Sequence, residues 1–365
     1  MVNNCSIVSA GGTGGHIMPA LAVCKELMTK GLVVFYIGNR PSMEYDIISH
    51  HNINFFAIDV QKLYRSFTLK HFMFPFKLIK SIRKCLKYFR QIKPIAFIGF
   101  GGFVSGPPAV AAWMLKCPVF LQEQNARPGL TNLWTGKIAK AVFLAYEESR
   151  QYFRDCRSYL VGNPLLMESP PLRPSQEGNT RKVLLILGGS QGSLFINNLI
   201  LEHLDWFEAQ GIEIFWQTGK KHLHAIMEQV HDRANVFCFD FTNSIDEFYH
   251  VAGYVISRGG ALSLAEAEVF RLPAFIIPLQ TAAVNEQYFN AKSMEKRNMG
   301  ICFEQKEKAN FKQRFTEFMQ KAETMYTDKK EPIHLSASEN IVRLMMQEIN
   351  WKTTLSQKPL KKVVE

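Results

Sequence analysis

The chain alternates short apolar runs, typical of buried strands, with longer segments whose apolar residues recur at helical spacing. The predicted strands are 5–10, 33–37, 54–58, 95–98, 118–121, 141–144, 158–161, 182–187, 212–217, 235–239, 253–256 and 274–277. Helical spacing falls between them, over 19–30, 76–90, 108–116, 193–203, 219–231, 261–270 and 285–297. Such alternation predicts an α/β fold with parallel sheets.

The pattern of strand, glycine turn and helix starts twice, once at residue 5 and again at residue 183. Between the two halves, 162–180 is rich in Pro, Gly and Ser, a composition typical of a linker. We therefore expect two Rossmann-like, doubly wound parallel-sheet domains that face a central cleft. The N-terminal domain spans 1–162 and the C-terminal domain 163–335. A helix at about 336–352 and a basic tail at 353–365 follow.

Composition narrows the class of protein. The chain is 47% hydrophobic and 21% charged, as globular proteins are. Its cysteines form no C-x-x-C pair and lie mostly in apolar runs, which predicts buried thiols in a reducing cytoplasm. No signal peptide is predicted, because the N-terminus lacks a basic region. The uncharged segment 94–115 is long enough to span a bilayer, but its central glycines and prolines favour a strand, a loop and a helix.

The net charge of +11 is localised. Between Val60 and Gln122 there are eleven Lys and Arg residues and no Asp or Glu. Aromatic and basic residues alternate there at helical spacing, which predicts a helix lying on an anionic membrane. The membrane-contacting candidates are Phe67, Phe72, Phe76, Lys77, Lys80 and Arg83. The alternative is a core-packed helix with a solvated basic face; no RNA-binding signature is present, so no nucleic acid partner is expected.

Four glycine-rich turns follow predicted strands, at 11–15, 99–102, 188–192 and 259–260. Glycine lets the backbone approach a ligand, and amides at a helix start bind anions. A dinucleotide site is disfavoured, because Ile17 stands where the third glycine of G-x-G-x-x-G is needed. No Walker A lysine and no D-x-D motif occurs, so we predict no metal and no cofactor. The turns favour a nucleotide-binding cleft.

Four polar side chains near these turns are candidates for the chemistry. His16 can bond a phosphate, act as a base, or merely cap its helix. Glu123 can act as a base or orient one, and Asn125 can bind hydroxyls, unless 122–125 is a surface loop. Glu266 lies about one and a half turns into a helix and can accept both hydroxyls of a ribose. The alternative for Glu266 is a solvated helix residue.

Six motifs run in one order from residue 5 to about 291. They are Gly11-Gly12-Thr13-Gly14-Gly15-His16, Gly99-Phe100-Gly101-Gly102-Phe103-Val104-Ser105-Gly106-Pro107, Glu123-Gln124-Asn125, Gly162-Asn163-Pro164, Gly188-Gly189-Ser190-Gln191-Gly192 and Arg258-Gly259-Gly260-Ala261-Leu262-Ser263-Leu264-Ala265-Glu266. Together they resemble the MurG family, glycosyltransferases of peptidoglycan synthesis that convert lipid I to lipid II, a step of cell wall biogenesis on which cell shape and division depend.

The resemblance implies a GT-B fold and inverting, metal-independent transfer of N-acetylglucosamine. The implied donor is UDP-N-acetylglucosamine, and the implied acceptor is undecaprenyl-diphosphate-MurNAc-pentapeptide at the cytoplasmic face of the inner membrane. Other cell-wall synthesis proteins are possible partners. With His16 or Glu123 as the base, the implied substrate-binding residues are Thr13, Gly14, Gly15, Asn125, Ser190, Thr242, Ala261, Leu262, Ser263, Leu264, Ala265, Glu266 and Gln287.

The chain departs from the family pattern at several positions. Leu166 stands where the family usually has an arginine, Gln122 replaces a usual histidine, and Phe103 replaces a frequent tyrosine. Two alternative functions therefore stay open. One is another GT-B enzyme, a glycolipid synthase or a UDP-sugar epimerase. The other is a non-catalytic nucleotide-sugar-binding protein on the membrane.

Overall fold

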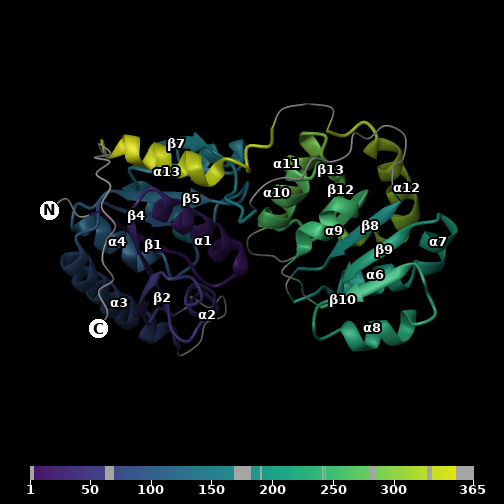
Figure 1. The fold of residues 1–365 in the computed structure, drawn as a ribbon, viewed down its shortest axis with the longest axis horizontal. Coiled ribbons are helices and arrows are strands. Elements are labelled where there is room, and N and C mark those ends of the chain that lie inside the picture. The colour runs from purple at the N-terminus through teal and green to yellow at the C-terminus, as the bar shows by residue number, and fades with distance from the viewer. Residues whose placement is uncertain are drawn as a thin grey trace.

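The fold consists of two α/β domains that lie side by side along the longest axis of the molecule (Figure 1). A computed structural model describes residues 4–61, 70–167, 182–189, 191–240, 242, 244–279, 285–326 and 331–350, and the side chains of the third helix from Phe74 onward. Predicted features at Ser190, Phe67, the Phe72 side chain and the tail 353–365 lie outside these residues.

The N-terminal domain is built on a seven-stranded parallel sheet with the order β3-β2-β1-β4-β5-β6-β7. Its strands are β1 (Cys5–Ser9), β2 (Val33–Asn39), β3 (Asn54–Ile58), β4 (Ala96–Gly99), β5 (Val119–Glu123), β6 (Ala141–Leu144) and β7 (Arg157–Leu160). The C-terminal domain has a six-stranded parallel sheet with the order β10-β9-β8-β11-β12-β13. Its strands are β8 (Val183–Leu187), β9 (Glu213–Gln217), β10 (Val236–Phe239), β11 (Tyr254–Ser257), β12 (Ala274–Ile276) and β13 (Gly300–Cys302).

Helices cover both faces of each sheet. Those on the N-terminal sheet are α1 (Gly14–Thr29), α2 (Met43–Ile48), α3 (Lys70–Ile92), α4 (Gly106–Met114), α5 (Leu130–Thr135) and α13 (Ala337–Glu348), with the 3-10 helices η1 (Gly136–Ile138) and η2 (Glu147–Tyr152). Those of the C-terminal domain are α6 (Leu194–Leu201), α7 (Leu204–Ala209), α8 (Leu223–Val230), α9 (Ile245–Val251), α10 (Ala261–Val269), α11 (Glu286–Lys296) and α12 (Phe311–Ala322), with η3 (Gln305–Asn310).

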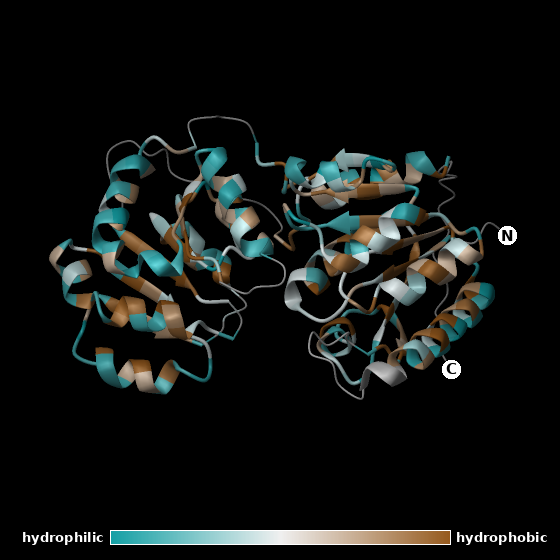
Figure 2. Ribbon diagram, turned by 180° about the vertical axis from the view of Figure 1, so that it is seen from behind, coloured by the Kyte–Doolittle hydropathy of each residue, from teal (hydrophilic) through white to brown (hydrophobic). Residues whose placement is uncertain are grey.

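Each sheet separates two apolar layers, which is the arrangement of a doubly wound fold. On the N-terminal sheet, α1 and α13 pack on one face and α3 and α4 on the other. On the C-terminal sheet, α6, α7 and α12 pack on one face and α10 and α11 on the other. Hydrophobic residues gather in the strands and hydrophilic ones on the outer sides of the helices (Figure 2). The predicted α/β, doubly wound fold is confirmed.

The chain crosses between the domains twice. The first crossing follows β7, and the second runs from the C-terminal domain to α13, which lies along the N-terminal domain beside β7 (Figure 1). Ile341, Val342 and Met345 of α13 are buried in the same apolar cluster as Leu21 of α1. The C-terminal helix is therefore part of the N-terminal core.

The uncharged segment 94–115 folds as β4, a glycine loop and α4. Among the residues that the structure describes, no helix is both long and apolar enough to cross a bilayer.

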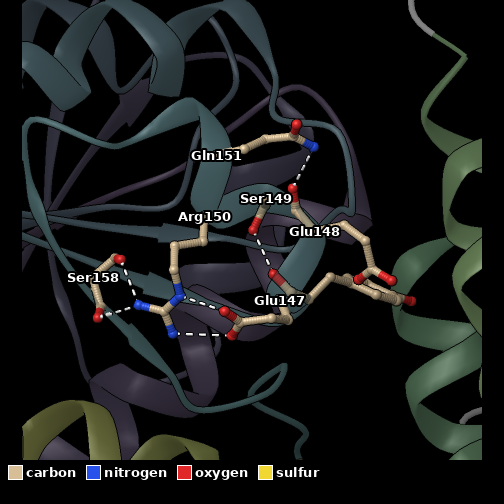
Figure 3. Close-up of polar contacts among 7 residues, drawn as sticks. Glu147, Glu148, Ser149, Arg150, Gln151 and Ser158 are labelled. Atoms are coloured by element: carbon tan, nitrogen blue, oxygen red, sulfur yellow. Dashed lines mark hydrogen bonds and ion pairs between the residues drawn. The ribbon is translucent and has the colours of Figure 1, made fainter.

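A compact polar cluster fixes the connection between β6 and β7 (Figure 3). The Arg150 guanidinium donates to the Glu147 carboxylate at 2.5 and 3.0 Å, and to the backbone oxygen and hydroxyl of Ser158 at 2.9 Å each. Arg150 therefore ties η2 to the edge strand β7.

Candidate active site

The four glycine turns occupy the positions where doubly wound folds bind ligands. The strand order reverses between β1 and β4 in one sheet and between β8 and β11 in the other. A glycine turn follows each of these four strands, at 11–15, 99–102, 188–192 and 259–260. Ligands of open α/β sheets bind outside the carboxyl ends of the strands at this reversal. The topology thus gives each domain one candidate site built from two turns.

The two N-terminal turns pack directly against each other. A Cβ on Gly102, whose φ is +71°, would lie 2.1 Å from the carbonyl oxygen of Gly11. A Cβ on Gly12, whose φ is +95°, would meet the Phe103 ring at 3.4 Å. A side chain is therefore disfavoured at both positions by the left-handed backbone, and at Gly102 it is also excluded by the lack of space. The second turn acts as a rigid support for the first.

His16 stands in the first turn of α1, which begins directly after Thr13. Its Nδ1 lies 3.0 Å from the Thr13 hydroxyl oxygen, so this hydroxyl fixes the ring orientation. A Cβ on Gly101 would be 3.2 Å from His16 Cδ2, which places Gly101 against the other edge of the ring. Burial lowers the pKa of His16 to about 4. The imidazole is therefore neutral at pH 7 and able to accept a proton.

The Glu123 side chain, at the end of β5, is 1% exposed and bonded on both carboxylate oxygens. Oε1 accepts from the backbone N–H and the side-chain amide of Asn125 at 3.0 and 3.2 Å. Oε2 accepts from Gly129 N–H at 3.3 Å and from the Asn132 amide at 2.9 Å. Burial raises the pKa of Glu123 to about 7, against the effect of these donors. The geometry is that of a carboxylate that organises the loop around it.

Buried side-chain amides form a hydrogen-bond network next to Glu123. The Gln122 amide donates to Asn163 Oδ1 at 3.2 Å, and the Gln124 amide to Phe100 O at 2.9 Å. The Asn163 amide in turn donates to Gln124 O at 3.1 Å. Gln122, which stands where the family usually has histidine, thus belongs to a neutral network. No sequence motif indicated Asn132, because it lies in the short helix α5 outside every motif.

In the C-terminal domain, the turn after β11 opens α10. A Cβ on Gly259, whose φ is +81°, would lie 2.8 Å from Gln287 O, so this turn packs tightly on the start of α11. Gly260 is the N-cap of α10. Ala261, Leu262 and Ser263 form its first turn, whose backbone N–H groups lack intrahelical partners. Free amides of this kind and the helix dipole favour an anion at this position. Leu264 and Ala265, one position further on, are buried.

Glu266 is held by a buried tyrosine. The Tyr249 hydroxyl donates to Glu266 Oε2 at 2.9 Å, and Tyr249 itself is fully buried and stacked on Phe270. Burial raises the pKa of Glu266 to about 7. Since Glu266 stays partly exposed, its carboxylate can accept ligand hydroxyls while Tyr249 fixes its orientation.

Two further predicted residues are partly engaged by the protein. The side-chain Oε1 of Gln287 accepts from Leu279 N–H at 2.8 Å, which leaves the side-chain –NH2 group as the natural donor to a ligand. The Thr242 hydroxyl accepts from Ser244 N–H at 3.0 Å. Leu166 packs against the N-terminal core and supplies no charge at the position of the family arginine.

Direct hydrogen bonds join the two halves of the site. Asn290 of α11 bonds to Asn125 and Ala126 of the N-terminal domain. Asn163 of the first crossing donates from its amide to Ala261 O at 3.3 Å. The loop around Glu123 and the start of α10 therefore lie against each other. Among the described residues, no group of His, Cys, Asp and Glu side chains is arranged to hold a metal ion.

Two Rossmann-like domains, each with glycine turns where its strand order reverses, are the architecture of a GT-B glycosyltransferase, and family models agree. The glycosyltransferase family 28 N-terminal domain matches residues 6–144, and the glycosyltransferase family 28 C-terminal domain matches 183–347. The chain belongs to the MurG family, the UDP-N-acetylglucosamine–N-acetylmuramyl-(pentapeptide) pyrophosphoryl-undecaprenol N-acetylglucosamine transferases.

Three relatives carry this assignment. The transferase of Francisella tularensis is 36% identical over 323 residues, covering 84% of this chain and 85% of its own. That of Flavobacterium psychrophilum is 33% identical over 309 residues, covering 82% and 84%. The crystal structure of Acinetobacter baumannii MurG is similar with a TM-score of 0.76 at 28% identity, covering 94% of this chain and 99% of that one.

Proposed function

We propose that this chain transfers N-acetylglucosamine from UDP-N-acetylglucosamine to the 4-hydroxyl of undecaprenyl-diphosphate-MurNAc-pentapeptide, converting lipid I to lipid II. The observation that carries the proposal is the pairing, across the domain junction, of an anion-binding helix start beside Glu266 with a glycine turn that holds a neutral histidine. The names of the relatives supply the identity of donor and acceptor.

The donor lies mainly on the C-terminal domain in this proposal. The first-turn amides of α10 hold the diphosphate, and Glu266, fixed by Tyr249, accepts the ribose hydroxyls. Gln287 donates to the sugar, joined by Asn125 from the other domain. Ser190 and Thr242 complete the diphosphate and uracil contacts. Because Leu166 brings no cation, the charge on the departing diphosphate is met by backbone amides and the α10 dipole.

His16 serves as the base, and Glu123 positions the loop beside it. The muramoyl 4-hydroxyl oxygen attacks C1 of the donor sugar, the bond from C1 to the phosphate oxygen breaks, and configuration inverts. The hydroxyl proton passes to His16 Nε2 while Nδ1–H donates to the Thr13 oxygen, and UDP leaves with the bonding electrons. The assignment of His16 as base and Glu123 as positioning residue is supported by the Glu123 carboxylate, which already accepts four hydrogen bonds from its own loop.

The acceptor approaches from the N-terminal domain, where Thr13, Gly14 and Gly15 meet its diphosphate. The membrane contact is α3, whose outer surface carries hydrophobic and hydrophilic residues side by side (Figure 2). Phe76 is 70% exposed, Ile79 is 49% exposed, and Lys80 and Arg83 are exposed beside them. Apolar insertion together with attraction to anionic lipid holds the protein at the cytoplasmic face of the inner membrane.

Neighbouring helices extend this surface. Trp113 at the end of α4 is 55% exposed, and α4 packs on α3. A large exposed aromatic side chain next to a basic helix favours a peripheral membrane contact over a solvated helix face.

The test is transfer of radiolabelled N-acetylglucosamine from its UDP donor to a lipid I analogue in detergent. We expect a labelled lipid product and release of one UDP per sugar. Conversion of the donor in the absence of the acceptor would identify an epimerase. Transfer of the sugar to a different lipid would identify a glycolipid synthase. Tight UDP binding without any transfer would identify a non-catalytic protein, and each of these results would overturn the proposal.

A further inference from the structure

Asn290 forms a buried polar bridge between the two domains. It lies on α11 and is fully buried. Its side-chain nitrogen donates to Asn125 Oδ1 at 3.0 Å and to Gly259 O at 3.1 Å. Its side-chain oxygen accepts from Ala126 N–H at 2.8 Å. One amide thus joins the loop after β5 in the N-terminal domain to the turn before α10 in the C-terminal domain.

The bridge continues on both sides toward the reacting groups. In the N-terminal domain, Asn125 donates to the Glu123 carboxylate from its backbone and its side chain. In the C-terminal domain, Gly259 directly precedes Gly260, the N-cap of α10. A continuous path of hydrogen bonds therefore runs from Glu123 through Asn125 and Asn290 to the start of the diphosphate-binding helix.

This bridge exists only when the two domains have the relative placement seen in the structure, which we call their register. If they separate, the Asn290 oxygen loses Ala126 N–H, and its nitrogen loses Asn125 Oδ1. A polar group that stays buried without a partner costs free energy. All three contacts form together in only one relative placement of the domains, so they favour that placement over a range of others.

We propose that Asn290 is a positioning residue that sets the register between the donor turn and the Glu123 loop, so that sugar transfer requires it while UDP binding does not. This inference rests on the proposed function. UDP is held by groups of the C-terminal domain alone, whereas transfer needs His16 and the Glu123 loop from the other domain. Loss of the bridge therefore lowers kcat and leaves the Kd for UDP nearly unchanged.

The chemistry of the bridge requires an amide. Its donors face two acceptors, Asn125 Oδ1 and Gly259 O, and its acceptor faces one donor, Ala126 N–H. A carboxylate of the same size satisfies Ala126 but opposes both acceptors. Asn290→Asp is thus the sharpest variant, because it keeps the volume of the side chain and reverses two of three contacts.

The experiment compares Asn290→Asp and Asn290→Ala with wild type in the full chain, using the lipid I analogue for kcat and calorimetry for UDP binding. We expect kcat to fall at least about tenfold, equivalent to about 1.4 kcal/mol of transition-state stabilisation. The Kd for UDP should stay within about twofold of wild type. Asn340→Asp is the matched control, since the Asn340 amide bonds, within the described part of the chain, only to Ser336 and Arg343 of its own helical region.

A double-mutant cycle with Asn125→Ala separates loss of the Asn290 bridge from a general loss of stability or activity. If Asn290 acts through Asn125, the second substitution adds little to the first, whereas independent effects would add. Should Asn290→Asp fail to fold by circular dichroism, Asn290→Ala tests the bridge, because it removes all three side-chain contacts without adding a charge.

Three results would overturn the inference. They are an unchanged kcat in Asn290→Asp, a loss of UDP affinity equal to the loss of kcat, and additive effects in the cycle. If wild type transfers no sugar, the proposed function fails instead. The bridge then remains testable by small-angle scattering with UDP-N-acetylglucosamine, where the variant should stay more extended than wild type, and identical profiles would refute it.

Discussion

The two candidate bases, His16 and Glu123, have pKa values shifted in opposite directions by burial. His16 has a pKa near 4 and Glu123 near 7. A neutral His16 as base predicts a kcat that stays constant from pH 8 down to about 5 and falls as His16 protonates. A Glu123 base predicts a fall as pH drops through about 7. The measurement is kcat at saturating donor, which keeps ligand-site titrations out of the profile.

Substitutions sharpen this comparison. His16→Ala and Glu123→Ala should each lower kcat far more than they weaken UDP binding, His16 by removing the proton acceptor and Glu123 by loosening the loop. Glu123→Gln should retain more activity than Glu123→Ala, since an amide keeps one acceptor oxygen for the surrounding donors. Near-normal turnover in both alanine variants would refute the assignment.

The Tyr249–Glu266 pair makes donor binding depend on pH. The Glu266 pKa lies near 7, so the carboxylate that accepts ribose hydroxyls is ionised above that pH and lost below it. UDP binding should therefore tighten as pH rises through 7. Tyr249→Phe removes a hydrogen bond that favours the ionised form. We expect about tenfold weaker UDP binding at pH 7 and a higher midpoint, measured by calorimetry.

A second tyrosine–glutamate pair provides the control. The Tyr159 hydroxyl donates to Glu348 at 2.5 Å on the α13 side of the N-terminal domain. Tyr159→Phe should leave the UDP affinity and its pH midpoint unchanged. Equal effects of the two phenylalanine variants would show that the Tyr249 result reflects lost stability.

Single residues were predictable where a motif carried them. The motifs placed His16 and Glu266 on helices that follow glycine turns, and the structure has His16 in the first turn of α1 and Glu266 within α10. The roles of the two side chains stay predictions. The hydrogen bonds of Glu123 and Asn290 were not predictable, because their partners come from short helices and from the other domain. Ala126 and Asn290, for example, are hydrogen-bonded although 164 residues separate them along the sequence.

At the level of elements, the back-to-back glycine turns should be intolerant of any side chain. Gly102→Ala places a Cβ 2.1 Å from Gly11 O at a φ of +71°. Gly31→Ala is the matched control, with a φ of +81° and open space around it, so it measures backbone strain alone, about 1–2 kcal/mol. We expect Gly102→Ala to lower the free energy of unfolding about twice as much or more, measured in urea. Equal losses would mean that the turns can separate.

The outer face of α3 should govern membrane binding independently of donor binding. Lys80→Glu and Arg83→Glu should each weaken binding to anionic vesicles by about 1 kcal/mol or more, with the effect shrinking at high salt. Phe76→Ala should weaken it at any salt, because it removes apolar area. Binding is measured by co-sedimentation with vesicles, and the UDP affinity of each variant should equal that of wild type. Met227→Ala on α8, 50% exposed in the other domain, is the control; a matching loss there would argue against α3.

Elements were predictable where the apolar run was long enough. All twelve predicted strands occur, since buried parallel strands read as continuous apolar segments. The strand β13 was missed because Gly300–Cys302 has only three residues and opens with glycine. The helix α1 begins at Gly14, five residues before its predicted start, because the glycine turn itself enters the helix.

At the scale of the whole molecule, one histidine joins the two crossings of the chain. His334 of the second crossing accepts on Nδ1 from Asn163 N–H of the first crossing at 2.7 Å. Its Nε2 lies 3.3 Å from Glu268 Oε2, and Glu268 bonds to Arg297 at 2.9 Å. Arg297 in turn lies over the Tyr146 ring of the N-terminal domain, 5.7 Å from its centroid. Both crossings therefore meet at one buried polar cluster.

His334→Ala should lower the melting temperature and kcat together while leaving UDP affinity intact. It leaves Asn163 N–H buried without a partner, which costs about 1–3 kcal/mol, and it frees the crossings to move apart. His231→Ala is the control, because among the described residues the exposed His231 contacts only Glu228 O and the Asp232 carboxylate at its own helix end. A lower melting temperature with unchanged kcat would assign His334 to stability alone. A lower kcat in both His334→Ala and Asn290→Asp, with UDP affinity kept in each, would mean that two separate contacts hold the domains in the register that transfer requires.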